Sequence, residues 1–214
     1  SEMCIRDRRR AIAQKLDAER RAAQELEIAK QVQARLFPQA LPCFAPLDYA
    51  GVCLQAQEVG GDYYDFLSLG PNRLGLVLGD IAGKGIAAAL LMANLQAHLR
   101  GQCASLTHDV RKRLALVNQL FYENTSDGAY ATLFFGEFDE RDCCLHYVNC
   151  GHLPALLLRG DNSVERLNST ATVLGLFPEW KCSRGERRLC SGDILALYSD
   201  GITESFNDEE QEYG

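Results

Sequence analysis

The first part of the chain is a long segment in which apolar residues recur at helical spacing between charged ones. Residues 8–37 contain neither Gly nor Pro and are rich in good helix formers. The apolar positions form an irregular stripe: Ile12, Leu16, Ala23, Leu26, Ala29, Val32 and Leu36. Pro38 ends the pattern. The segment predicts one long helix, which either packs on the domain that follows or pairs with a second copy as a coiled coil.

Beyond this helix, short runs with alternating or continuous apolar residues predict strands separated by turn residues. The predicted strands cover residues 47–56, 62–69, 74–81, 130–139, 143–149, 154–159, 163–167, 184–190 and 193–198. Two consecutive helices are expected between the third and fourth strands, over residues 85–102 and 107–124, with Thr107 as the N-cap of the second.

The order of these elements indicates the fold class. Residues 62–69 and 74–81 are expected to form one hairpin, and residues 184–190 and 193–198 another. Strands in hairpin order around two helices predict an α+β fold with antiparallel sheets, because the strand–helix alternation of a parallel sheet is absent.

Three aspartates each adjoin a glycine and flank a strand-like run. They are Asp62 after Gly60-Gly61, Asp80 after Gly79, and Asp200 before Gly201. Taken singly, each is equally explained as a turn or cap residue. Together they predict one cation site, because clustered carboxylates repel one another and Mg²⁺ and Mn²⁺ prefer oxygen ligands.

Two further polar residues near these segments are expected to be structural. Asp65 should point away from Asp62, because the two are three residues apart on one strand. His152 follows a glycine in a turn, and a structural role is favoured over catalysis.

Charge and cysteine content exclude several function classes. The net charge is −7, but residues 1–36 carry a net charge of +3, so the rest of the chain carries −10. Nucleic acid is therefore not expected as a partner. The nine cysteines form no Cys-x-x-Cys pair, which argues against a disulfide framework and a zinc site and favours reduced thiols. No apolar run or signal peptide predicts a membrane span, so a cytoplasmic protein is expected.

Seven segments, in order, resemble the SpoIIE/RsbU branch of the PPM metal-dependent Ser/Thr protein phosphatases. They are residues 29–38, 58–66, 79–85, 131–136, 149–155, 173–176 and 197–204. The resemblance covers residues 29–214 and implies an αββα sandwich of two antiparallel sheets with a metal site at one end.

The resemblance also implies a site and a reaction. Asp80 would bridge two Mn²⁺ or Mg²⁺ ions, the Ile81 carbonyl would be a ligand, and Asp62 and Asp200 would each bind one ion. A water activated by both ions would hydrolyse phosphoserine or phosphothreonine on a regulatory protein, often a STAS-type anti-sigma-factor antagonist. Ala82 stands where better-known members carry a His, which leaves the general acid unassigned.

The same resemblance divides the chain into two parts. Residues 1–37 would connect an upstream sensor or receiver domain to the phosphatase and could form a homodimer, while residues 38–214 would form the phosphatase domain. That domain is expected to be incomplete at its C-terminus, because no candidate follows for the family's last metal-binding Asp. The alternative function is a non-catalytic phosphoprotein-binding pseudophosphatase or an inactive fragment, and a purely structural coiled-coil dimer is a third.

Overall fold

The computed structural model describes residues 2–55, 58–104, 109–125, 128–207 and 211. In chain order its elements are α1 (Glu2–Ala34), β1 (Tyr63–Ser68), β2 (Arg73–Ile81), α2 (Gly85–Cys103), α3 (Val110–Asn124), β3 (Ala131–Asp139), β4 (Cys144–Cys150), β5 (Ala155–Leu158), β6 (Val164–Leu167), β7 (Gly185–Arg188), β8 (Ile194–Ala196) and α4 (Asp200–Thr203).

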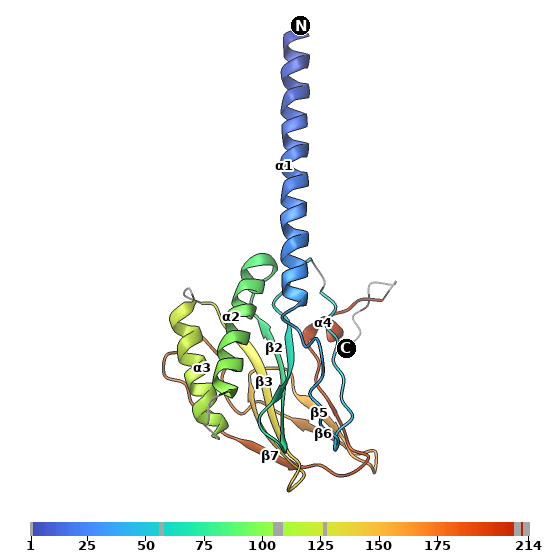
Figure 1. Cartoon of the computed structure of the whole chain (residues 1–214), viewed down its shortest axis with the longest axis vertical. Helices are drawn as coiled ribbons and strands as arrows, with labels where there is room; N and C mark the ends of the chain where they lie inside the picture. The colour runs from blue at the N-terminus through green and yellow to red at the C-terminus, as the bar shows by residue number, and fades with distance from the viewer. Residues whose placement is uncertain (1, 56–57, 105–108, 126–127, 208–210, 212–214) are drawn as a thin grey trace.

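The strands form two sheets in which every pair of neighbours is antiparallel. The larger sheet has the order β1-β2-β3-β4-β7, and the smaller has the order β6-β5-β8. Helices α2 and α3 cover one face of the larger sheet, and the smaller sheet lies on its other side (Figure 1). The α+β fold with two antiparallel sheets is therefore confirmed.

Two hydrophobic clusters correspond to the two contacts of the larger sheet. The first lies between that sheet and helices α2 and α3, where Met92, Leu114 and Phe135 are fully buried. The second lies between the two sheets, where Leu74, Phe134 and Leu167 meet. Because strand residues alternate between faces, Asp80 points to the side of the smaller sheet while Ile81 packs under the helices.

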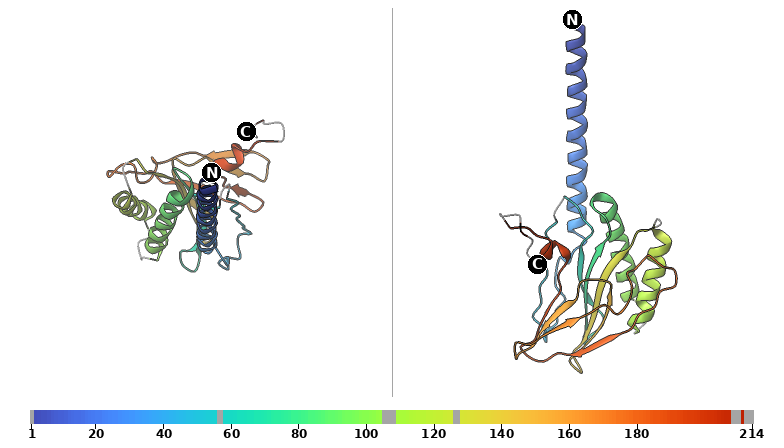
Figure 2. Two further views of the ribbon diagram at one scale, coloured as in Figure 1. Left: turned by 90° about the horizontal axis from the view of Figure 1, so that it is seen from above. Right: turned by 180° about the vertical axis from the view of Figure 1, so that it is seen from behind.

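Helix α1 projects from the body along most of its length and touches it only at its foot (Figures 1 and 2). Ile12 and Leu16 remain 52% and 50% exposed, so this stretch of the helix does not pack on the domain that follows. At the foot, Gln33 is only 5% exposed, and the Phe37 ring stacks on Tyr64 with 5.4 Å between centroids.

The predicted strand over residues 47–56 is wrong over its described part, residues 47–55, which form no strand. Leu47 and Tyr49 pack against the core between the sheets, whereas Val52 and Leu54 are exposed. The apolar residues of this segment therefore reflect side chains that pack against the core. They do not indicate a strand paired with a neighbouring strand.

The predicted hairpin of residues 184–190 and 193–198 is also wrong. Strand β7 pairs with β4 in the larger sheet, and β8 pairs with β5 in the smaller one. The turn between them, closed by a hydrogen bond from Asp193 N–H to the Cys190 carbonyl, carries the chain from one sheet to the other. Alternation predicts a strand but does not specify its partner.

The N-cap of α3 is Asp109, whose side chain accepts a hydrogen bond from Arg111 N–H at 3.0 Å. The predicted N-cap, Thr107, lies outside the described residues. None of the described helices combines the length and apolar character that a membrane crossing requires.

Candidate metal centre at one end of the sheets

The centre begins with a close approach between two backbone segments. A side-chain carbon added to Gly61 would lie 2.8 Å from the Ile81 carbonyl oxygen and 3.2 Å from Oδ1 of Asp80. Ala131 opposite Ile81 exchanges its backbone hydrogen bonds with Leu174, so the Ile81 carbonyl is turned to the other side, toward Gly61. Glycine at position 61 therefore leaves this carbonyl and the Asp80 carboxylate accessible to a ligand.

Asp80 lies at the end of β2 on the face turned toward the smaller sheet. Burial, followed by the negative charges of Asp62 and Asp200, raises the pKa of Asp80 to about 7. A hydrogen bond from the Ile81 backbone lowers it and does not offset the rise. The part of this shift that comes from Asp62 and Asp200 places their charges close enough to Asp80 to act on it.

Asp62 immediately precedes β1 and is half-buried. Burial and then the charge of Asp200 raise its pKa, while a hydrogen bond with Ser199 lowers it. Its Oδ1 atom is buried and, within the described part of the chain, has no hydrogen-bond partner. A buried carboxylate oxygen without a partner is unfavourable, and a cation would satisfy it.

Asp200 is the first residue of the one-turn helix α4 and is exposed. In Figure 1, α4 lies beside the foot of α1, at the end of the sheets where Asp62 and Asp80 also lie. The structure thus brings together three residues that are 18 and 120 positions apart in sequence.

His152 ties the segments around these aspartates together. Its Nδ1 lies 2.8 Å from Oγ1 of Thr132, the residue opposite Asp80 in the β2–β3 register. Its Nε2 lies 3.2 Å from the Tyr198 carbonyl, two residues before Asp200. A carbonyl can only accept, so Nε2 carries the proton and Nδ1 accepts from the Thr132 hydroxyl. Burial lowers the pKa of His152, which favours this neutral form and a positioning role.

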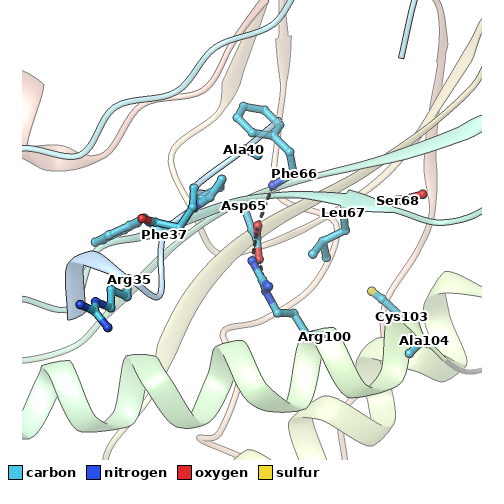
Figure 3. A pocket seen from close by; sticks show the side chains of 12 residues that line it. Arg35, Phe37, Ala40, Asp65, Phe66, Leu67, Ser68, Arg100, Cys103 and Ala104 are labelled. Carbon is cyan, nitrogen blue, oxygen red and sulfur yellow. Dashed lines mark hydrogen bonds and ion pairs between the residues drawn. The ribbon is translucent and has the colours of Figure 1, made fainter. Parts of the chain in front are cut away.

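Asp65 is fully buried on the opposite face of β1 and belongs to a different interaction. Its carboxylate accepts hydrogen bonds from the Tyr63 hydroxyl at 2.6 Å and from Nε and Nη2 of Arg100 at 2.7 and 3.0 Å. Figure 3 shows Asp65 and Arg100 facing each other beside a cavity of about 440 Å³ at the foot of α1. The prediction that Asp65 points away from Asp62 and is structural agrees with this geometry.

The donor set fits a divalent cation. Three carboxylates and a backbone carbonyl are the hard oxygen ligands that Mg²⁺ and Mn²⁺ prefer, and the unpartnered Oδ1 of Asp62 and the raised pKa of Asp80 mark a deficit of positive charge. Among the described residues, the oxygens of the three aspartates do not all converge within 4.8 Å.

Sequence reasoning missed two contributors to this centre. Gln33 donates a hydrogen bond from Nε2 to the Gly60 carbonyl at 2.7 Å and accepts one at Oε1 from Gly60 N–H at 3.1 Å. Thr132 connects His152 to the strand opposite Asp80. In the sequence Gln33 does not differ from the polar residues around it. Only its burial in the folded structure, at the foot of an otherwise exposed helix, marks it as a contact residue.

Solved structures with the same arrangement define the class. The chain aligns with the PP2C domain of SiaA from Pseudomonas aeruginosa at a TM-score of 0.74 and 16% identity, covering 92% of this chain and 79% of that one. It aligns with the PP2C phosphatase domain of SpoIIE from Bacillus subtilis at a TM-score of 0.61 and 26% identity, covering 68% and 43%. Two antiparallel sheets with flanking helices are thus the fold of a PP2C domain.

Sequence comparison identifies the family. The model of the Stage II sporulation protein E (SpoIIE) family matches residues 70–214, and the chain belongs to this family. Phosphoserine phosphatase RsbU of Bacillus subtilis (strain 168) is 28% identical over 181 residues, which are 84% of this chain and 53% of that protein. The predicted resemblance is therefore confirmed. The chain spans about half or less of the length of the curated relatives it matches.

Proposed function

We propose that the chain is a metal-dependent protein-serine/threonine phosphatase that hydrolyses phosphoserine or phosphothreonine on a regulatory protein. The observation that carries this proposal is the gathering of Asp62, Asp80 and Asp200 at one end of the sheets, where the buried Oδ1 of Asp62 has no hydrogen-bond partner among the described residues. Burial, and then the charges of Asp62 and Asp200, raise the pKa of Asp80 to about 7, and a cation would neutralise this cluster. Membership of the SpoIIE family and similarity to a relative named phosphoserine phosphatase support it.

Asp62, Asp80, Asp200 and the Ile81 carbonyl would hold two Mn²⁺ or Mg²⁺ ions. Bound there, the ions would supply the charge that activates a water and neutralises the phosphoryl oxygens. The chain's own groups hold this arrangement in place. Gly61 keeps the Ile81 carbonyl accessible, and His152 links the strand opposite Asp80 to the segment that ends at Asp200.

The substrate and setting belong to the same proposal. The substrate would be a phosphorylated STAS-like anti-sigma-factor antagonist in a partner-switching pathway, supported by the similarity to RsbU and SpoIIE. The eight cysteines with described side chains are all free thiols, which supports a reducing compartment such as the cytoplasm.

Residues 1–37 would form a connector and residues 38–214 the phosphatase domain. Near its end the connector is hydrogen-bonded to the body at two points. Gln33 binds the backbone of Gly60, two residues before Asp62, and the Gln96 side chain of α2 donates to the Leu36 carbonyl. A sensor or receiver domain attached upstream would therefore act on the centre by moving the foot of α1.

We expect α1 to pair with α1 of a second copy. Ile12 and Leu16 are half-exposed on a stretch of α1 that projects away from the described part of the body, and Ala23 and Leu26 continue the same face. The double substitution Ile12→Glu/Leu16→Glu should convert a dimer into a monomer in sedimentation velocity, whereas Gln14→Glu on the opposite face should leave it dimeric. A wild-type protein that sediments as a monomer at its highest soluble concentration would refute the pairing.

The function is tested by phosphate release from a phosphoserine-bearing STAS-domain protein, with Mn²⁺ or with EDTA. We expect release only with the metal, its loss in Asp62→Asn, and its retention in Asp48→Asn, where the aspartate is exposed and outside the centre. Release in EDTA would contradict the metal-dependent mechanism. A folded chain that binds the phosphoprotein without releasing phosphate would instead be a non-catalytic binding module.

A further inference from the structure

A second group of potential metal ligands lies on strands β4 and β7, away from the aspartates. Cys144 Sγ lies 3.9 Å from His146 Nδ1, and His146 Nδ1 lies 3.4 Å from Oε2 of Glu186. The three ligand atoms all lie within 4.8 Å of one another, which no other group of three such side chains achieves among the described residues.

The strand register explains the convergence. Strands β4 and β7 are antiparallel, His146 lies directly opposite Glu186, and Cys144 is two residues from His146 on the same face. Cys144 is buried, His146 has a side chain 20% exposed, and Glu186 has one 57% exposed. The group is therefore buried on the Cys144 side and accessible to solvent on the Glu186 side.

The spacing matches a tetrahedral ion. With Zn–S near 2.3 Å and Zn–N or Zn–O near 2.0–2.1 Å, tetrahedral ligand atoms lie about 3.3–3.6 Å apart. The two measured separations of 3.4 and 3.9 Å are already close to these values. A thiolate, an imidazole and a carboxylate form a mixed set that suits Zn²⁺ and not Mg²⁺, which prefers oxygen alone.

The charged residues around this group mostly pair with one another, which leaves its three side chains available to bind a metal ion. On the same sheet face, Glu137 lies opposite His146 and Asp139 lies opposite Cys144. Glu137 forms ion pairs with Arg73 and Arg113. Asp139 forms an ion pair with Arg141. Two other charged residues adjoin Cys144: Asp142 accepts a hydrogen bond from its backbone N–H, and Arg188 lies opposite it in the strand register. Near Glu186, Nη2 of Arg184 lies 3.4 Å from Oε2 at an exposed position. Exposed ion pairs contribute little free energy, so a zinc ion can replace this contact.

We propose that Cys144, His146 and Glu186 form a Zn²⁺ site with a fourth position open to water. Zinc binding would release the thiol proton of Cys144 to solvent and form a Zn–S bond, while His146 would bind through Nδ1. The proposal is independent of the phosphatase activity.

The position of the site indicates its role. Strand β7 lies at the edge of the larger sheet, has only four residues, and pairs with β4. The chain then crosses to β8 in the smaller sheet and continues to Asp200. A zinc ion shared by β4 and β7 would fix this edge strand where the chain leaves the larger sheet.

Cobalt(II) tests the site, because only a thiolate ligand gives an intense near-ultraviolet sulfur-to-cobalt charge-transfer band. The oxygen-only centre at Asp80 cannot produce one. Titration of the reduced, metal-free chain with Co²⁺ should produce the band with one equivalent bound, and one equivalent of Zn²⁺ should abolish it. We expect no band in Cys144→Ser, and at least about tenfold weaker Co²⁺ binding in His146→Gln and in Glu186→Gln.

Cys143→Ser is the matched control, because Cys143 is the adjacent cysteine but is exposed and lies outside the group. It should keep the band and its affinity. Glu186→Gln changes an exposed side chain, so a folding defect does not explain weaker binding there. No band in the wild-type chain, or an undiminished band in Cys144→Ser, would overturn the proposal.

Discussion

Asp80→Asn is expected to reduce metal-dependent phosphate release by at least about two orders of magnitude while making the metal-free protein more heat-stable at pH 8. Activity would fall because the central carboxylate of the proposed metal centre loses its charge. Stability rises because the substitution removes one of three mutually repelling charges from a half-buried position.

The pH dependence of the stability gain follows from the direction of the pKa shift. The pKa of Asp80 rises from an ordinary value near 3.8 to about 7 in the folded chain. Between these values the unfolded chain releases a proton that the folded chain retains, so the free energy of unfolding falls as pH rises. The difference between Asp80→Asn and wild type should therefore be small at pH 4, grow up to pH 7, and then stay constant.

Thermal unfolding in EDTA from pH 4 to pH 8 measures this directly, with Asp48→Asn as the control that should follow the wild type. Adding Mn²⁺ should raise the melting temperature of the wild type at pH 8 and raise that of Asp80→Asn much less. A variant that is destabilised at pH 8, or one with undiminished phosphate release, would contradict the assignment of Asp80 to the metal centre.

Gln33→Ala is expected to raise the Mn²⁺ concentration needed for half-maximal activity by about tenfold, which corresponds to about 1.4 kcal/mol of metal binding. Gln33 makes two hydrogen bonds to the backbone of Gly60, and the next two residues are Gly61 and Asp62. Removing the side chain leaves the Gly60 N–H and carbonyl without these partners and loosens the segment that positions Asp62.

The expected signature is a shift in metal requirement with a smaller change in activity at saturating Mn²⁺, measured by phosphate release across a Mn²⁺ titration. Gln31→Ala is the matched control, because Gln31 lies two residues away on the exposed side of α1 and bonds only to Glu27 within the described contacts. If Gln33→Ala and Gln31→Ala have the same Mn²⁺ requirement, the foot of α1 does not act on the centre.

Most of the secondary structure could be predicted because local patterns determine it. The hairpin of β1 and β2 follows from two apolar runs around a Gly-Pro-Asn turn, and the observed strands reach within one residue of the predicted ends. The errors arose where a pattern has two structural solutions. Residues 47–55 alternate without pairing, and β7 and β8 are adjacent in sequence but belong to different sheets.

The residues of the candidate site likewise fall into those that local sequence patterns indicate and those that only long-range contacts reveal. Asp62, Asp80 and Asp200 could be selected because each adjoins a glycine next to a strand, which is a local feature. Gln33 and Thr132 could not, because their contacts with Gly60 and His152 join residues 27 and 20 positions apart. The Cys144, His146 and Glu186 group was likewise hidden, since no spacing within β4 alone shows that β7 adds a carboxylate.

The sequence by itself therefore determined most of the element types, the antiparallel α+β class and the family, and it singled out the three aspartates as candidates. It could do so because hydrophobic periodicity, turn residues and motifs each involve residues that are close together in the sequence. Only the tertiary structure decided which strands are neighbours, that Gln33 joins α1 to the centre, and that β7 brings Glu186 to Cys144 and His146. Those contacts depend on burial and strand register, which arise when distant segments pack together.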